Sequence, residues 1–337
     1  MAKSKDIRCG VVGYGGAFNM GQTHLNSMVR NRRMEVAAVC ELDSARRKVA
    51  KDDFPGVETF AQVGDMLKNA ELDLVTIITP HNTHAPLAIE CLNSGVNVVC
   101  EKPLAITSRQ VKDMMSAAKK NGVMLSTFHN RRWDGDFQTL RDLVNKEKAI
   151  GRVHRIEAGF YGYGSQGNWW RSDRKISGGA IYDWGAHFTD WILNVLPEKI
   201  DWVSGYQVKN RQWKGYSNED HSEYSMRFAS GAIATLTISN LSMSGRPRWR
   251  VLGERGSIED VGGKFLLKTL VNGRQMSTEV PYAESNWHAY YENVYKHLQG
   301  RAKLIITPES AARVIGVLEA ANISAERDSK PVKPAFI

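Results

Sequence analysis

The chain has 337 residues, of which 42% are hydrophobic and 24% charged, and its formal net charge is +9. This length favours two domains over a single core, and the composition is that of a soluble globular protein rather than a disordered or membrane-spanning one. The basic residues are dispersed and no expected helix carries a sustained basic face. We therefore expect no nucleic-acid partner and interpret the charge as a solvated surface that attracts small anionic ligands.

The segment from Met1 to Arg8 leads directly into a strand pattern and lacks the apolar core and cleavage site of a secretory signal. We therefore expect a cytoplasmic protein with no membrane partner. The four cysteines lie in the first third of the chain without CxxC spacing. Buried reduced thiols, rather than disulfides or metal ligands, are expected at Cys9, Cys40, Cys91 and Cys100.

From Ile7 to Cys100, short β-branched runs alternate with segments of helical period. This alternation is typical of βαβ units around a parallel sheet, and nearly all-apolar runs fit strands covered on both faces. We assign residues 1–128 to this first domain. Its expected strands are Arg8 to Val12, Val36 to Cys40, Leu74 to Ile78, Val96 to Cys100 and Met124 to Phe128.

After Gly151 the pattern changes to strand candidates separated by turns, which indicates a large, mostly antiparallel sheet. The candidates are residues 153–163, 202–208, 223–228, 232–238, 249–252 and 265–270. Helical segments are expected from Gly179 to Val195, Trp287 to Gln299 and Pro308 to Ala325. The whole is then an α/β protein whose second domain, residues 129–337, is of α+β type.

A glycine-rich turn follows the first strand. Residues without a Cβ let backbone N–H groups approach a pyrophosphate at a helix N-terminus. The turn departs from GxGxxG because the third glycine is delayed to Gly21, as though three residues had been inserted. The residues expected to contact a dinucleotide are Gly13, Gly15, Gly16, Ala17, Phe18, Asn19 and Met20.

Glu41 ends the second strand, at the distance where an acidic residue accepts hydrogen bonds from an adenosine ribose. Its charge repels a ribose 2′-phosphate and so favours NAD over NADP. Ser44, Arg46 and Arg47 follow closely, however, and these residues leave NADP open.

A polar loop follows the third strand at the carboxyl edge, where open sheets bind ligands. Its residues Thr79, Pro80, Asn82 and His84 are expected beside the cofactor. His81 and His84 resemble half a metal site, but no thiolate or carboxylate cluster accompanies them, so we expect no metal.

Two further motifs carry candidate chemistry. Glu101-Lys102-Pro103 follows the fourth strand, so Lys102 should project from the sheet edge and donate to a substrate oxygen. Gly178-Gly179 precedes a helical segment in which Asp183 and His187 are four apart, hence on one face. The carboxylate can orient the imidazole, which titrates near neutral pH and can act as a general base.

With these motifs the chain resembles the Gfo/Idh/MocA family of oxidoreductases over essentially its whole length. The resemblance implies a Rossmann domain followed by a domain with a large open sheet whose outer face commonly forms a dimer or tetramer interface. It also implies a sugar, cyclic polyol or derivative bound between the domains. It assigns Lys102 as the catalytic lysine, His187 as the proton-transferring histidine and Asp183 as a carboxylate that contacts substrate or relays the proton, and it places Glu101 and Lys102 beside the cofactor.

Substrate contacts are expected from two further segments. Arg131, in the stretch from Asn130 to Asp134, is similar to an arginine that many members place near the cleft. Trp170 and Arg171 lead into the catalytic segment. Tryptophan rings stack on sugar faces, and arginine binds hydroxyls or carboxylates in a bidentate manner.

We therefore predict an NAD(P)-dependent enzyme that transfers hydride between nicotinamide and a hydroxyl or carbonyl carbon of a sugar or polyol. Two alternatives stay open. One is a redox-elimination glycosidase that retains its NAD, to which the long Gly15 to Gly21 loop is suited. The other is a non-catalytic nucleotide-binding sensor, which has no need of Lys102, Asp183 and His187 together.

Overall fold

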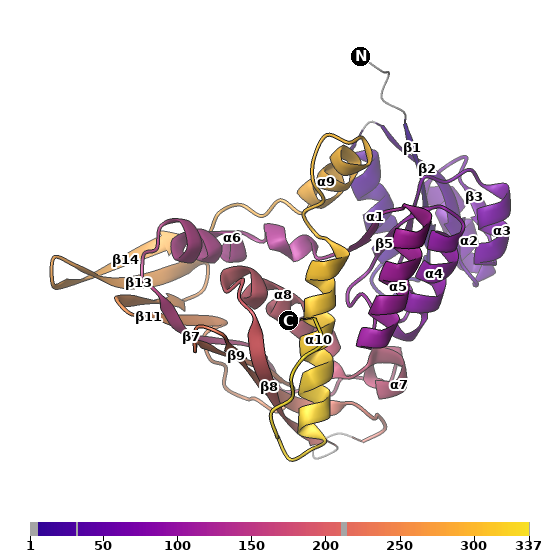
Figure 1. Cartoon of the computed structure of the whole chain (residues 1–337). Coiled ribbons are helices and arrows are strands. Elements are labelled where there is room, and N and C mark those ends of the chain that lie inside the picture. Colours follow the sequence, from indigo (N-terminus) through magenta and orange to yellow (C-terminus); the bar gives the residue numbers. More distant parts are fainter. Residues whose placement is uncertain (1–5, 32, 210–213, 337) are drawn as a thin grey trace. The chain divides into compact units, whose positions relative to one another are not determined.

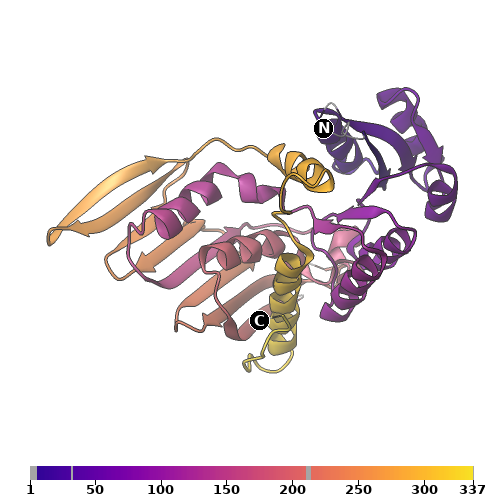
Figure 2. The same ribbon diagram turned by 45° about the horizontal axis from the view of Figure 1, so that its top comes forward.

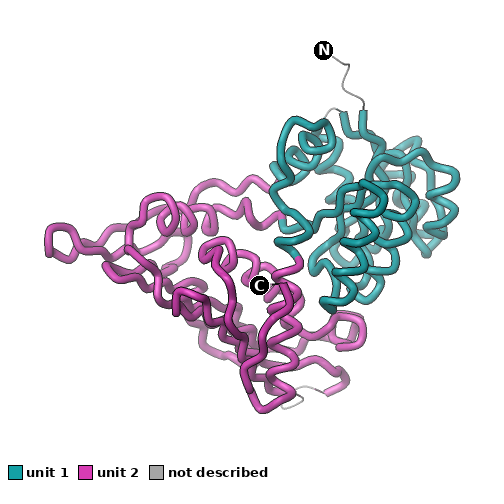
Figure 3. The backbone as a smooth tube through the Cα atoms, in the orientation of Figure 1, with its two compact units in different colours: residues 1–129, 288–311 teal, residues 130–287, 312–337 magenta. Residues whose placement is uncertain are grey.

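The computed structural model describes residues 6–31, 33–209 and 214–336. Residues 1–5, on which the expected lack of a secretory signal partly rests, lie outside them. The chain forms two compact units, and each is described by itself below. Unit 1 comprises residues 1–129 and 288–311, and unit 2 comprises residues 130–287 and 312–337 (Figure 3). The predicted division after residue 128 did not anticipate that residues 288–311 pack with the first unit.

Unit 1 contains a six-stranded sheet in the order β3-β2-β1-β4-β5-β6, with every pair parallel. The strands are β1 Ile7–Val12, β2 Met34–Cys40, β3 Glu58–Phe60, β4 Leu74–Ile77, β5 Asn97–Cys100 and β6 Leu125–Thr127. Strand order reverses beside β1, which is where doubly wound sheets bind ligands. Strand β3 was not predicted, because it is a short edge strand without a buried apolar run.

Helices α1 to α5 alternate with these strands, and α9 joins the unit from far along the chain (Figure 1). They are α1 Met20–Val29, α2 Ser44–Asp53, α3 Val63–Asn69, α4 His84–Asn93, α5 Ser108–Asn121 and α9 Ala289–Leu298, with the short turn η1 His81–Thr83. Helix α5 begins at a capping box in which Thr107 and Gln110 satisfy each other's backbone N–H groups. The four cysteines are buried thiols, as predicted.

Unit 2 contains an eight-stranded sheet in the order β14-β13-β12-β11-β7-β10-β9-β8, in which only the β7 and β10 pair is parallel. The strands are β7 Val153–Tyr161, β8 Ile200–Lys209, β9 Glu219–Phe228, β10 Ile233–Ser239, β11 Trp249–Gly253, β12 Gly256–Asp260, β13 Lys264–Val271 and β14 Arg274–Pro281. The mostly antiparallel sheet is confirmed. Strands β12 and β14 were missed because they carry little apolar alternation, and β14 is exposed along almost its whole length.

Helices lie over one face of this sheet (Figure 2). They are α6 Gly135–Arg141, continued by the π turn η3 Asp142–Lys146, α8 Trp184–Val195 and most of α10 Pro308–Ala325; the unit also has α7 Arg174–Ser177 and the short turns η2 Asn130–Trp133, η4 Trp170–Ser172 and η5 Ala180–Tyr182. Phe188 and Trp191 of α8 pack on Trp249 of β11, with ring centroids 5.4 and 5.7 Å apart. No helix within the described ranges is both long and apolar enough to cross a bilayer.

The predicted helix from Gly179 to Val195 is wrong at its start. Gly178 and Gly179 have φ angles of 87° and 127°, which are not helical. A short 3-10 turn follows, and Asp183, with φ −81° and ψ −90°, separates that turn from α8. The helix that the periodicity predicted begins only at Trp184.

Candidate functional site

The glycine-rich turn of unit 1 is shaped by close approaches at two of its glycines. Gly13 has φ 102°, and a Cβ there would lie 2.4 Å from the carbonyl oxygen of Ile78, so only glycine fits between β1 and β4. A Cβ on Gly21 would lie 2.6 Å from the Tyr14 ring, so the delayed third glycine still lets α1 pack on the turn. A Cβ on Gly15 would meet nothing within 4 Å, which leaves the backbone open to a pyrophosphate.

Glu41 is tied to this turn by its carboxylate. Oε2 accepts the backbone N–H of Tyr14 at 2.6 Å, and Oε1 accepts that of Asp43 at 3.0 Å. Arg46 reaches the same turn, where Nε donates to the carbonyl of Tyr14 at 2.8 Å, while Arg47 donates to the carbonyl of Glu41 at 2.6 Å. One acidic and two cationic side chains therefore converge where the adenosine ribose is expected.

The loop after β4 is braced by His84. This side chain is fully buried, and its ring nitrogens lie 2.8 Å from the carbonyl oxygens of Thr79 and Pro103. Burial lowers the pKa of His84 despite both carbonyls. The imidazole thus links the loops that follow β4 and β5, whereas Asn82 is exposed at the edge. Among the described residues, no group of three or more histidine, cysteine or acidic side chains is arranged to hold a metal.

Lys102 follows β5 and is half-buried. Its backbone N–H donates to Oε2 of Glu101 at 2.9 Å, and the other carboxylate oxygen, Oε1, lies 3.0 Å from Nε2 of His24. Burial acts to raise the pKa of Glu101, but the His24 hydrogen bond and the charges of His24 and Lys102 outweigh it, so the pKa is lowered. Glu101 is therefore held as a carboxylate at the base of the candidate catalytic lysine.

In unit 2 the structure brings together Arg171 and Asp183. Nη1 of Arg171 donates to Oδ2 of Asp183 at 3.1 Å, and both side chains keep partial exposure. The guanidinium also lies over the rings of Trp169 and Trp170, 5.3 and 5.1 Å from their centroids. A carboxylate, a guanidinium and two indole rings are groups that bind polyhydroxylated molecules.

His187 lies in the first turn of α8, after the break at Asp183. Asp183 precedes the helix, so the prediction that one helix places both residues on one face is wrong. The His187 ring is nearly buried, with its centroid 5.7 Å from that of Trp184 and 6.2 Å from that of Trp191. The guanidinium of Arg131 lies over Trp184 at 4.8 Å, so this predicted arginine shares an aromatic neighbour with the histidine.

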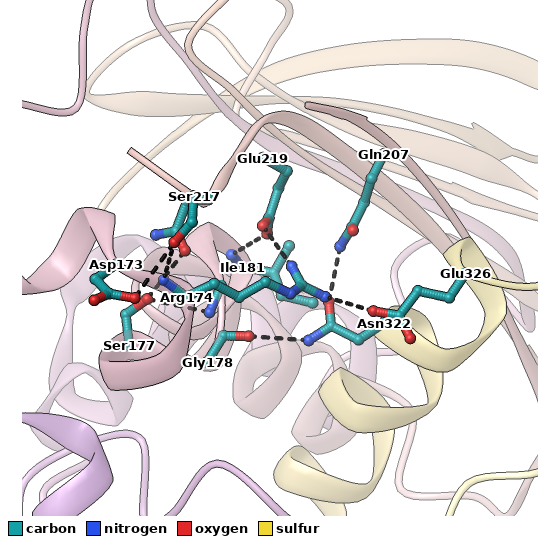
Figure 4. A network of polar contacts seen from close by, with 12 residues as sticks. Asp173, Arg174, Ser177, Gly178, Ile181, Gln207, Ser217, Glu219, Asn322 and Glu326 are labelled. Carbon is teal, nitrogen blue, oxygen red and sulfur yellow. Dashed lines mark hydrogen bonds and ion pairs between the residues drawn. The ribbon is translucent and has the colours of Figure 1, made fainter. Parts of the chain in front are cut away.

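A partly buried ion pair that the sequence did not reveal supports the double-glycine turn (Figure 4). Glu219 of β9 is fully buried; Oε1 accepts the N–H of Ile181 at 3.1 Å, and Oε2 accepts from Arg174 at 2.9 Å. Asn322 of α10 donates to the carbonyl of Gly178 at 3.1 Å. The apolar residues of β9 do not indicate that Glu219, the first residue of this strand, is buried.

Arg248 is a second residue that the sequence did not single out. Its guanidinium lies over the rings of Trp184, Phe188 and Trp191, at 5.7, 5.3 and 5.0 Å, and forms an ion pair with Asp136 at 3.4 Å. Burial raises the pKa of Asp136, although the Arg248 charge opposes it. Only the folding of β11 beside α8 brings this cation to the aromatic rings around His187.

Residues 7–129 match an oxidoreductase family with an NAD-binding Rossmann fold, and residues 137–259 match the GFO/IDH/MocA C-terminal domain. The scyllo-inositol 2-dehydrogenase (NADP(+)) IolW of Bacillus subtilis is 24% identical over 341 residues, covering 95% of this chain and 94% of its own. The uncharacterized oxidoreductase YdgJ of Escherichia coli is 30% identical over 279 residues, covering 82% and 77%. The solved WlbA dehydrogenase of Bordetella pertussis, in complex with NADH and UDP-GlcNAcA, shares the fold with a TM-score of 0.83 at 23% identity, covering 99% of this chain and 100% of that one.

Proposed function

The chain belongs to the Gfo/Idh/MocA oxidoreductase family, and on that premise we propose that it transfers a hydride between NAD and a hydroxyl-bearing carbon of a sugar, cyclic polyol or derivative. The observation that carries the proposal is the cluster of Arg171, Asp183 and Trp170 in the segment leading into the helix of His187. Such groups suit a polar, hydroxyl-rich ligand. The name of the relative IolW, an inositol dehydrogenase, supports the same substrate class.

The proposed roles follow from side-chain chemistry. His187 removes the hydroxyl proton, and Lys102 donates a hydrogen bond to the same oxygen as negative charge develops on it. Asp183 and Arg171 hold the neighbouring hydroxyls. A bound nicotinamide would supply the hydride acceptor for the carbinol carbon, whose C–O bond would become a carbonyl. In the reverse direction His187 returns the proton to the alkoxide.

For the cofactor we propose NAD over NADP, with Gly13, Gly15 and Gly16 supplying the open backbone of the turn. Glu41 supports this choice because its carboxylate is fixed at the turn, where it repels a 2′-phosphate. Arg46 and Arg47 are the groups that favour NADP, and IolW, by its name, uses NADP. The preference therefore depends on which side chain faces the ribose.

We also propose a homodimer or homotetramer assembled through the sheet of unit 2. Large apolar side chains are exposed on this sheet and its last hairpin, including Tyr206, Leu270 and Met276 at 56%, 52% and 53%. Light scattering on the purified protein measures the assembly, and a monomer at working concentration contradicts this part of the proposal.

The direct test is nicotinamide absorbance while purified protein meets NAD⁺ or NADP⁺ with cyclic polyols, aldoses and glycosides. We expect reduction with one class of polyol or sugar, and loss of turnover in Lys102→Ala and His187→Ala. Full activity in Lys102→Ala removes its catalytic role. Glycoside cleavage without net reduction supports the redox-elimination alternative instead.

A further inference from the structure

A line of four polar side chains runs through the interior of unit 1 and ends at Glu101. Oγ1 of Thr76 on β4 lies 3.1 Å from Oη of Tyr291 on α9. Tyr291 Oη lies 2.6 Å from Nδ1 of His24 on α1, and Nε2 of His24 lies 3.0 Å from Oε1 of Glu101. We call these four residues the His24 network. It joins three elements and the loop after β5, and one of the elements, α9, comes from far along the chain (Figure 3).

The network lies in an apolar and aromatic environment. His24, Thr76 and Tyr291 are fully buried, and the Glu101 side chain is only 13% exposed. The His24 ring lies 4.2 Å from the ring of Phe128 and meets Tyr291 edge-on at 5.8 Å. Burial raises the pKa of Tyr291 far above its ordinary range, so its hydroxyl keeps its proton. In such surroundings each polar group needs a partner within the network.

Counting protons fixes the role of Nε2 of His24. An ionised Glu101 only accepts, so Nε2 of His24 must carry the proton that is donated to Oε1. In the neutral imidazole Nδ1 is then an acceptor, which the Tyr291 hydroxyl satisfies, and the hydroxyl of Thr76 donates to Tyr291 in turn. In the charged imidazole Nδ1 instead donates to the Tyr291 hydroxyl, which then donates to Thr76, so in both states Nε2 donates to Glu101 and every polar group of the network has a partner.

Glu101 is thereby held at both oxygens, one by His24 and the other by the backbone N–H of Lys102. We propose that His24 is a positioning residue, which fixes the Glu101 carboxylate and through it the backbone that presents Lys102. This inference rests on the proposed function of Lys102. The imidazole acts on the reaction only through Glu101, so it changes turnover more than substrate affinity.

The test compares His24→Gln with His24→Asn. The glutamine amide nitrogen reaches the place of Nε2 and can still donate to Glu101, whereas the shorter asparagine places its amide near Nδ1, beside Tyr291. Both variants lose the packing of the ring on Phe128, so their melting temperatures should fall by similar amounts. Tyr291→Phe is the third variant, since it removes the hydroxyl while it keeps the ring.

We expect His24→Asn to lower kcat by about tenfold or more with KM for the substrate nearly unchanged, and His24→Gln to recover most of the loss. Tyr291→Phe should lower kcat less, because Nε2 of His24 still donates to Glu101 in that variant. Equal losses in the Gln and Asn variants, or wild-type kcat in His24→Asn, overturn the proposal, because either result assigns His24 to packing only.

Crystal structures of the two variants give a readout that does not depend on turnover. We expect Glu101 to keep its position in His24→Gln and to rotate in His24→Asn. If the wild-type protein reduces neither NAD⁺ nor NADP⁺ with any substrate, the proposed function fails, while the Glu101 positions still decide the role of His24. An unchanged Glu101 in His24→Asn refutes the positioning role by itself.

Discussion

Arg171 donates a hydrogen bond from Nη1 to Oδ2 of Asp183 over 3.1 Å, while its guanidinium lies 5.1 Å from the centroid of the Trp170 ring. Arg171 and Asp183 were each predicted to contact substrate, but nothing in the sequence predicted that they contact each other. The pair is partly exposed, so it contributes little to stability, about 1 kcal/mol or less. Its position suits a role in binding.

We expect Arg171→Ala to raise KM for the substrate by about tenfold, because charge-assisted hydrogen bonds are lost, with a smaller change in kcat. Arg171→Lys should give an intermediate KM, since it keeps the charge and loses the planar fork. Steady-state kinetics measure both. Arg155→Ala is the control, since Arg155 pairs with Glu157 in β7 of the sheet. An unchanged KM in Arg171→Ala contradicts the binding role.

The double-glycine turn depends on Glu219. A Cβ on Gly179 would lie 3.1 Å from both Glu219 carboxylate oxygens, and φ is 127° there. We expect Gly179→Ala to destabilise the protein by about 1–3 kcal/mol from backbone strain, and by more where the contacts of the buried Glu219 carboxylate are disturbed. Chemical denaturation measures the free energy of unfolding.

Gly231→Ala is the matched control for that variant. Gly231 also has a positive φ, 88°, but a Cβ there meets nothing within 4 Å. The free energy of unfolding of Gly231→Ala should fall by only about 1–2 kcal/mol, because alanine is strained in the left-handed backbone conformation. Equal losses in the two variants show that the close approach of Glu219 has no energetic effect on the turn.

Cofactor preference should change through two side chains at the glycine turn. Glu41→Ala removes the charge that repels a 2′-phosphate, so we expect the ratio of kcat/KM for NADP⁺ to that for NAD⁺ to rise by about tenfold. Arg46→Ala should lower the same ratio, because a cation that can pair with the phosphate is lost. Initial rates with each cofactor give the ratio. A rise in Arg46→Ala reverses the assigned roles.

Acid stability should depend on Glu101. Its pKa is lowered in the folded protein, where the His24 hydrogen bond and nearby charges outweigh burial. The stability that this carboxylate contributes is therefore present above the ordinary glutamate pKa of about 4.3 and is lost as the pH falls through the lowered folded-state pKa. Glu101→Gln cannot titrate.

We therefore expect the difference in unfolding free energy between wild type and Glu101→Gln to be largest at neutral pH and to shrink in acid. Urea denaturation at a series of pH values measures it. A difference that stays constant from neutral pH into the acid range shows that the Glu101 charge does not stabilise the fold.

The two sheet types, and most of their strands, were predictable because apolar runs and alternation are local patterns. Helix α10 has the predicted bounds, Pro308–Ala325. The misses share one cause: β3, β12 and β14 lack a buried apolar pattern of their own and are stabilised by pairing with neighbours. Asp183 was placed inside a helix because the periodicity of α8 masked the break that Gly178 and Gly179 impose.

The sequence by itself determined the glycine turn, the acid at the end of β2, the lysine after β5 and the histidine of α8, because each depends on residue types at fixed short spacing. Only the tertiary structure decided which distant groups support them. Tyr291 meets His24, and Glu219 meets Arg174, across long stretches of chain. A buried polar group must find a partner, but the partner is chosen by packing, and packing leaves no local mark in the sequence.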